Sequence, residues 1–456
     1  MNPIPAELPI VSGQNMTDWG RMVHANVAQI ARPKTEAELQ AVVRYAAQNK
    51  LKISIRGAGH SALGQSIVDG GIMIDILGLN QVLELDQAKK TLRVQAGATW
   101  GQLTQALEPK RLAISTKQEF DNFTVGGSIA ANIHGKSIDY GPIIAHVLSL
   151  RLLKADGEIV NASRTQNPDL FTGAIGGYGL LGIVVDVTFQ LVEDRVVEKS
   201  ESVYMNTDAL LKAYVERVRR DPRNTPLCYG FFSSDCKLGF YVTYRYADAA
   251  GSSDLSALKR DETNPILFDI FAWLQRMFTF VRRRAFHTMW IDSANAETTL
   301  RSRRLLLWDN PPRAFRDMLL QKYYIPVDNF PGFVKKAGEI LGSHGNDIKL
   351  LTNHFRFMPA NSEALLACSR QDVMCFLPCY FANKDDPAWV KIYESVSNEL
   401  VNACLDHGGS FYLTFIPATV AQVRRAYPNW DRFIALKKQY DPDEVFSSSF
   451  YQRLAR

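Results

Sequence analysis

A short loop near the start of the chain places a histidine among small residues. Residues 56–61 read Arg-Gly-Ala-Gly-His-Ser and follow an apolar run at residues 51–55 that predicts a β-strand. Small residues after a strand let backbone N–H groups approach a bulky anion closely. His60 could then contact, or bond to, the molecule that the loop holds. The alternative is an ordinary tight turn with a solvent-facing histidine, because short glycine motifs often match by chance.

Two further groups of small residues lie downstream. Residues 123–136 contain the pair Gly126 and Gly127 and end in His-Gly-Lys. The third group comprises residues 150–156, 169–171, 176–179 and 181–184. In their order, spacing and residue types, these stretches resemble the flavin domain of the vanillyl-alcohol-oxidase superfamily, also called the p-cresol-methylhydroxylase-type FAD domain. The resemblance covers roughly residues 18–193, with weaker matches through to residue 456.

The resemblance implies an α+β protein with two domains. We expect an FAD-binding domain at residues 21–194 and a substrate or cap domain at residues 195–427, built on an antiparallel sheet with helices. An N-terminal tail would occupy residues 1–20. A C-terminal tail at residues 428–456 would return to the FAD-binding domain.

Local patterns agree with such a layered fold. An apolar stripe and the cap residue Thr35 predict a helix over residues 35–49, and a second helix is expected to begin near Thr99. Alternating helix and strand signals indicate α/β or α+β layers. The strands are expected at residues 51–55, 72–76, 92–96, 147–154 and 159–160.

The same resemblance implies which residues hold FAD. The first loop would wrap the pyrophosphate, and Gly126, Gly127 and Ser128 would run under the flavin rings, where only small residues let the backbone come close. His60 matches the position at which many members bond FAD covalently, so we expect a histidyl-linked FAD. The full expected set is Arg56, Gly57, Ala58, Gly59, His60, Ser61, Gln65, Thr124, Gly126, Gly127, Ser128, Asn132, His134, Gly135 and Ile183.

The implied chemistry is the oxidation of a carbon that bears a hydroxyl or amine, with a neighbouring base taking the released proton. Arg356 matches the arginine of a Glu-x-Arg strand in aldonolactone and alditol oxidases, and His354 takes the place of the glutamate. A histidine can serve as a general base near neutral pH; a core histidine is the alternative. Thr414 stands where gulonolactone oxidase and decaprenylphosphoryl-ribose oxidase carry a lysine.

Glu119 offers a second acid–base candidate. It lies seven residues before the paired glycines, at Gly126. The cytokinin-dehydrogenase branch places there an acid that receives a proton from a substrate nitrogen. A surface carboxylate is the alternative.

These features predict an FAD-dependent oxidoreductase, an oxidase, that acts on the CH–OH group of a sugar, polyol, lactol or other alcohol. O2 or another small acceptor would reoxidise the flavin. Two alternatives stay open: amine oxidation that uses Glu119, and a flavin-binding protein with altered catalysis.

Composition restricts the partners and the location. A net charge of +5 over 456 residues, without a basic block, argues against a nucleic-acid partner. Six scattered cysteines fit reduced thiols in a cytoplasmic protein, and Cys375 and Cys379 lack the second pair that a zinc site needs. No secretory signal is recognised at residues 1–14, and no apolar run reaches the ~18 residues of a membrane span.

Residues 266–290 are rich in Phe, Leu and Trp and contain a run of three arginines. The simplest interpretation is a core helix with a solvated basic end. The alternative is an amphipathic lid or membrane-surface helix, because basic residues beside bulky apolar ones favour anionic interfaces. Upstream, residues 249–254 predict a loop.

Overall fold

The computed structural model describes residues 7–247, 265–305, 318–345 and 347–454. A four-stranded sheet near the N-terminus has the order β1 (Ile10–Ser12), β4 (Gln29–Ala31), β6 (Ile72–Asp75) and β5 (Ile53–Arg56). Strand β6 runs parallel to both β4 and β5. Helix α1 (Glu36–Gln48) connects β4 to β5, and the Thr35 side chain caps it by accepting from the Glu38 N–H. A separate hairpin joins β2 (Asn15–Thr17) and β3 (His24–Asn26).

A five-stranded antiparallel sheet follows. Its order is β11 (Ile159–Ser163), β10 (Val147–Leu153), β12 (Ile183–Gln190), β8 (Thr91–Gln95) and β7 (Val82–Asp86). Helices α2 (Trp100–Leu107), α3 (Val125–Ala130) and α4 (Pro168–Ala174) accompany it, and short strands β9 (Leu112–Ala113) and β13 (Val192–Glu193) pair with each other. The first turn of α3 lies against the end of β8, where the Gly126 N–H donates to the Ala96 carbonyl at 2.7 Å.

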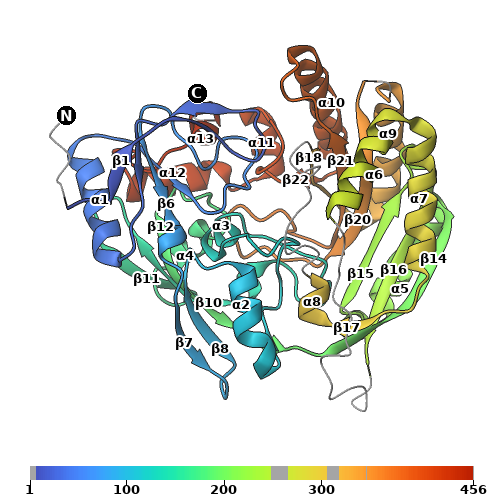
Figure 1. The fold of residues 1–456 in the computed structure, drawn as a ribbon, viewed down its shortest axis with the longest axis horizontal. Coiled ribbons are helices and arrows are strands. Elements are labelled where there is room, and N and C mark those ends of the chain that lie inside the picture. Colours follow the sequence, from blue (N-terminus) through green and yellow to red (C-terminus); the bar gives the residue numbers. More distant parts are fainter. Residues whose placement is uncertain (1–6, 248–264, 306–317, 346, 455–456) are drawn as a thin grey trace.

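A nine-stranded antiparallel sheet dominates the rest of the chain (Figure 1). Along its main path lie β17 (Thr298–Leu300), β14 (Val196–Asn206), β16 (Leu238–Tyr246), β15 (Leu227–Phe232), β20 (Lys349–Met358), β21 (Val373–Phe381), β19 (Tyr323–Pro326) and β22 (Ser410–Phe411). Strand β18 (Met318–Leu320) also pairs with β21. Helix α5 (Thr207–Arg220) covers one face of β14 and β16, whereas α9 (Phe330–Ser343) and α10 (Pro387–Asp406) pack beside β19. The short helix α8 (Arg301–Leu305) follows β17.

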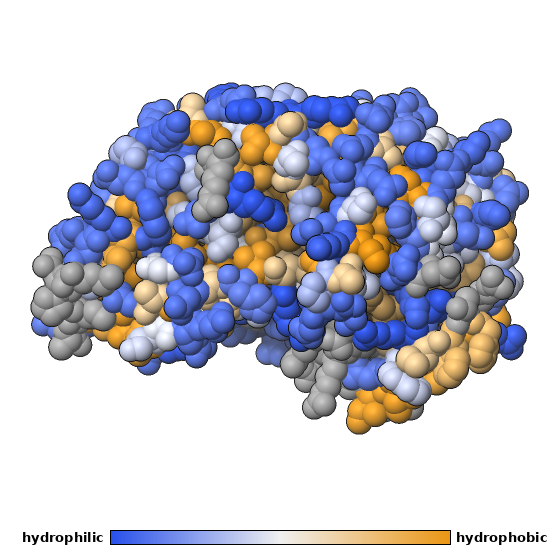
Figure 2. Space-filling model, turned by 90° about the horizontal axis from the view of Figure 1, so that it is seen from above, coloured by the Kyte–Doolittle hydropathy of each residue, from blue (hydrophilic) through white to orange (hydrophobic). Residues whose placement is uncertain are grey.

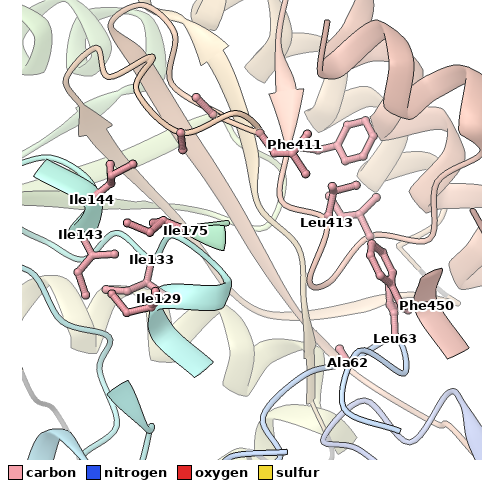
Figure 3. Packing of buried hydrophobic residues seen from close by; sticks show 14 of the residues in the cluster. Ala62, Leu63, Ile129, Ile133, Ile143, Ile144, Ile175, Phe411, Leu413 and Phe450 are labelled. Atoms are coloured by element: carbon pink, nitrogen blue, oxygen red, sulfur yellow. The ribbon is translucent and has the colours of Figure 1, made fainter. Parts of the chain in front are cut away.

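The C-terminal segment crosses back to the first sheet. It contains α11 (Val420–Ala426), α12 (Trp430–Tyr440) and α13 (Ser449–Leu454). Between α12 and α13, the Val445 carbonyl accepts from the Ile53 N–H at 2.6 Å, and the Ser447 N–H donates to the Ile53 carbonyl at 2.8 Å. Figure 3 shows Phe450 of α13 beside Leu63 and Leu413, and these buried residues belong to one hydrophobic core.

The mixed α+β class and the early elements agree with the sequence-based predictions. Strands β5, β6, β8 and β10 and helices α1 and α2 lie within two residues of the expected positions, and β11 begins at the expected residue but ends three residues later than expected. The sheets change over between Glu193 and Val196, while the division into domains stays a prediction. The loop expected at residues 249–254 lies outside the described residues.

The prediction of one core helix over residues 266–290 is wrong in two respects. Two helices, α6 (Pro265–Met277) and α7 (Thr279–Ser293), are separated by Phe278, whose backbone is extended. Several of their bulky apolar side chains are exposed, including Trp273 and Phe280. No residue type that usually breaks a helix marks the interruption, so the sequence pattern did not signal it.

Candidate functional site

A cavity of about 510 Å³ lies between the N-terminal sheets and the nine-stranded sheet. Its walls come from the loop after β5, from α3 and its flanking segments, and from strands β15, β20 and β21. Most of the predicted site residues line it: Gly57, Ala58, Gly59, His60, Ser61, Gln65, Glu119, Thr124, Gly127, His134, Gly135, His354 and Arg356.

Five residues of the expected FAD set lie behind this lining instead. The Arg56 guanidinium donates to the Thr17 carbonyl at 3.1 Å, and Gly126 packs against Ala96. The Ser128 hydroxyl and the Asn132 amide oxygen bond to neighbouring backbone groups, and Ile183 is buried in β12. Direct contact of Arg56, Gly126, Ser128, Asn132 and Ile183 with FAD stays a prediction.

The histidine loop (residues 57–66) is held by a buried aspartate. The Asp18 carboxylate accepts from the Gly64 N–H at 2.6 Å and from the Ser61 hydroxyl at 3.1 Å. Burial raises the pKa of Asp18 to about 6, although these donors and the Arg56 charge oppose the increase. Gly59 has a φ of 79°, and an added Cβ would come within 2.3 Å of the Arg56 guanidinium, so this turn requires glycine.

His60 lies in an aromatic pocket at the cavity wall. Its ring centroid is 5.2 Å from that of Trp19 and 4.2 Å from that of Phe123. Burial and the Arg56 charge lower the pKa of His60 to about 4, so its imidazole is neutral at neutral pH. Within the described part of the chain, its buried Nδ1 has no hydrogen-bond partner. His60 therefore contributes a neutral imidazole to the cavity wall, and its buried Nδ1 is left without a hydrogen-bond partner among the described residues.

A half-buried carboxylate and an arginine line the cavity, and a buried lysine lies beside that carboxylate. Glu119 Oε1 lies 3.4 Å from the Arg356 guanidinium and 3.6 Å from Lys136 Nζ. Burial disfavours the ionised carboxylate, but the charges of Lys136 and Arg356 outweigh burial and lower the pKa of Glu119 to about 2. The Glu119 side chain is 28% exposed, lines the cavity and lies beside Arg356 of β20.

The other two histidines that line the cavity, His354 and His134, are neutral and hydrogen-bonded. Burial lowers the pKa of His354 to about 3, and its Nε2 lies 2.8 Å from the Thr352 hydroxyl. His134 Nε2 lies 2.7 Å from the Tyr324 hydroxyl, and burial also lowers the pKa of His134. Both imidazoles can exchange hydrogen bonds with a ligand, but neither carries a charge near neutral pH.

Lys322, which was not predicted as a site residue, also lines the cavity. It lies between β18 and β19, and its carbonyl accepts from the Tyr412 N–H at 2.9 Å. Its Nζ lies 5.2 Å from the Tyr412 ring centroid and 5.9 Å from that of Phe415. Burial, followed by the Arg356 charge, lowers the pKa of Lys322 to about 8. No motif surrounds this lysine, and strand pairing brings it beside Tyr412, two residues before Thr414.

The cavity surface fits a flat cofactor. At Gly127 an added Cβ would meet only the Thr124 Oγ1, at 3.0 Å, and otherwise would project into the cavity. The His60 ring lines the same cavity. The six cysteines are unpaired, and no group of three or more potential metal ligands occurs among the residues that the structure describes.

Comparison with known proteins agrees with this geometry. A family model described as an FAD binding domain matches residues 27–163. The chain is 31% identical to L-gulonolactone oxidase of Mus musculus over 97% of this chain and 98% of the relative. It is 26% identical to decaprenylphosphoryl-beta-D-ribose oxidase of Mycolicibacterium smegmatis over 97% of both chains. Similarity to cytokinin dehydrogenase 2 of Arabidopsis thaliana, 30% identical, covers 37% of this chain and 34% of the relative.

Proposed function

Since the chain belongs to the vanillyl-alcohol-oxidase family of FAD-dependent oxidoreductases, we propose that it oxidises the CH–OH group of a sugar, polyol, lactol or other alcohol. One observation carries the proposal: the histidine loop and the Glu119–Arg356 pair open onto the same cavity. A flavin held by the loop and an alcohol held by the charged groups would then meet in one enclosure. Relatives that match over their whole length are named for a lactone or a sugar, which supports the same substrate class.

Bound FAD supplies the two-electron acceptor for this chemistry, while the protein orients the donor and moves the proton. The Arg356 guanidinium, 6% exposed and paired with Glu119, would hold a substrate oxygen or compensate negative charge on the reduced cofactor. Neutral His354 would bond to the donor hydroxyl. O2 or another small acceptor would then reoxidise the flavin.

The FAD would be bonded covalently to His60. Its unpartnered Nδ1 and neutral ring provide the nucleophile that such a bond needs. The first test is acid denaturation of the purified protein, followed by measurement of flavin absorbance and mass on the polypeptide. We expect both to stay with the wild type and to be lost in His60→Ala. Release of all flavin from the wild type would contradict the covalent bond but leave the oxidoreductase proposal standing.

The substrate class is tested by anaerobic bleaching of the flavin with a panel of sugars, polyols, lactones and amines. We expect alcohols to bleach the flavin and amines to fail, because a carboxylate whose pKa is about 2 is a weak proton acceptor for an amine. Bleaching by amines alone, with loss of the reaction in Glu119→Gln but not in His354→Ala, would support the amine alternative. A protein that binds flavin but is bleached by no donor would support altered catalysis.

The helical hairpin of α6 and α7 would contact an anionic lipid surface. Its exposed apolar side chains are Ile266, Ile270, Phe271, Trp273, Met277, Phe278, Phe280 and Ile291. In Figure 2, apolar surface gathers at the lower right edge, the end of the molecule where α6 and α7 lie in Figure 1. Single exposed apolar residues are common, but a contiguous group marks an interaction site.

The positive charges of this hairpin favour an anionic membrane as its binding partner. Arg276, Arg282 and Arg284 lie on the same two helices, and cations beside bulky apolar groups suit anionic headgroups. Phe271, Gln275 and Met289 of the hairpin also line the cavity, so lipid contact would occur beside the substrate site. No helix in the described ranges has both the length and the apolar character needed to cross a membrane, so this contact would be peripheral.

Sedimentation with vesicles tests this contact. We expect the protein to pellet with phosphatidylglycerol vesicles and to stay in solution with pure phosphatidylcholine. The double change Ile266→Ser and Phe280→Ser should abolish pelleting, whereas Val82→Ser and Leu83→Ser, on the exposed strand β7, should not. Equal pelleting by both pairs, or a hairpin-dependent dimer without vesicle binding, would contradict the membrane proposal.

A further inference from the structure

Several side chains that line the cavity could accept a proton. His60 is the expected attachment point of FAD, and His134 shares a hydrogen bond with the Tyr324 hydroxyl. Glu119 and His354 are engaged as well. Glu119 is held by the charges of Lys136 and Arg356. His354 shares a hydrogen bond with the Thr352 hydroxyl and packs at 4.3 Å, between ring centroids, on Phe231. Each would have to give up a stabilising partner in order to take a proton from a substrate.

Lys322 differs from both. Within the described ranges, its Nζ contacts only the faces of Tyr412 and Phe415 and has no carboxylate or carbonyl within bonding distance. The buried Lys136, which does not line the cavity, lies beside Glu119 and over the Tyr229 ring. The Lys322 amine therefore lies over two aromatic rings in the wall of the cavity, without an ion-pair partner among the described residues.

We propose that Lys322 is the catalytic base that accepts the hydroxyl proton of the alcohol substrate. This inference rests on the proposed function. The O–H bond breaks as the neutral amine of Lys322 becomes an ammonium, and the C–H bond breaks as its hydrogen and electron pair pass to FAD. The alcohol becomes a carbonyl compound, and the oxidised flavin becomes reduced.

The surroundings favour a neutral amine. Burial and the Arg356 charge lower the pKa of Lys322 to about 8, whereas the nearby Glu119 and cysteines oppose this decrease. A general base works best when its pKa lies near the working pH. The pKa of Lys322 lies closer to neutral pH than the pKa of Glu119 or of His354. The titratable or charged groups that face it are Arg356 and His354 on β20, Cys375 and Cys379 on β21, Glu119, Cys368 and His134.

The state of Lys322 can be measured without turnover. Trace acetylation of the intact holoenzyme across pH, with peptide mapping, reports the midpoint at which each lysine becomes reactive. We expect Lys322 to become reactive near pH 8, about two units below the ordinary value of about 10.4 for a lysine side chain. A midpoint for Lys322 at that ordinary value would overturn the proposal, whichever substrate the enzyme uses.

Kinetics of flavin reduction test the role itself. Lys322→Ala should retain bound flavin but lose about 10²–10⁴-fold in the rate of reduction by an alcohol, the usual contribution of a general base. The rate should rise with pH through a midpoint near 8 in the wild type and lose that dependence in the variant. Added ethylamine should restore part of the rate in Lys322→Ala, whereas Lys322→Arg, which keeps the charge, should stay slow.

The possible outcomes distinguish a failure of the proposed alcohol oxidation from a failure of the assignment of Lys322 as the base. Failure of every alcohol to reduce the wild-type flavin would overturn the proposed function, while acetylation would still report the state of Lys322. Normal reduction and an unchanged pH profile in Lys322→Ala would overturn the assignment of the base and leave the alcohol oxidation intact.

Discussion

Gly127 opens onto the cavity through the space that a side chain would fill. An added Cβ would meet only the Thr124 hydroxyl oxygen, at 3.0 Å, so the protein itself can accommodate alanine there. We expect Gly127→Ala to lower the affinity for FAD about tenfold or more, which corresponds to roughly 1.4 kcal/mol, because the methyl group competes with the cofactor. Flavin absorbance per protein after reconstitution measures this effect.

Gly135 provides the matched control for Gly127. It also lines the cavity, but an added Cβ would lie 2.3 Å from the Lys117 carbonyl oxygen. Gly135→Ala should therefore lower the melting temperature, whereas Gly127→Ala should leave it nearly unchanged. Equal flavin content in Gly127→Ala and the wild type would show that FAD does not pass over Gly127.

At the residue scale, the sequence predicted chemistry that comes from contiguous motifs. His60 and Gly127 stand in such motifs, and both line the cavity. The sequence could not predict which loop residues point inward, because Arg56 turns away to bond with Thr17. Lys322 escaped detection because its role depends on strand pairing with the segment of Tyr412, about ninety residues later in the chain.

At the element scale, the histidine loop depends on the buried carboxylate of Asp18. Its pKa is about 6 in the folded protein and 3.8 in the unfolded chain, so the folded state binds more protons between these values. Asp18→Asn cannot titrate at this position. The free energy of unfolding of the wild type, minus that of Asp18→Asn, should therefore fall by roughly 3 kcal/mol as the pH rises from about 4 to about 7. The difference should stay constant above that range.

Chemical unfolding of both proteins across this pH range measures the difference. Asp385→Asn, at an exposed position, serves as the control and should show no comparable trend. A difference that grows with pH would mean that hydrogen bonds from Gly64 and Ser61 outweigh the burial of Asp18.

Elements with strong local signals were predictable, and those shaped by distant contacts were not. Thr35 and an apolar stripe marked α1, and the structure places the cap where expected. The hairpin of α6 and α7 has apolar residues on faces that the protein leaves exposed, so a pattern typical of a core gave the wrong prediction. Exposure depends on what packs against a helix, which the helix sequence alone does not encode.

At the scale of the whole molecule, the C-terminal segment clamps both ends of the histidine loop. Before the loop, Val445 and Ser447 bond to the backbone of Ile53. After it, the Ser449 N–H donates to the Ile67 carbonyl at 2.8 Å. A return of this tail to the first sheet was expected from the family resemblance, whereas local sequence patterns contained no sign of it.

The buried Asp441 holds the C-terminal segment in place, so its substitution tests whether this segment supports the histidine loop. Its buried carboxylate pairs with Lys437 and accepts from the Val445 and Phe446 N–H groups, each at 2.8 Å. Asp441→Ala would leave Lys437 as an unpaired buried charge, which typically costs about 3–5 kcal/mol of stability. We expect a lower melting temperature, faster amide exchange over residues 53–67 and partial loss of flavin. Asp443→Ala, whose side chain is exposed two residues later, should behave like the wild type. Unchanged exchange over residues 53–67 in a destabilised Asp441→Ala would mean that the tail supports the fold without holding the loop that binds FAD.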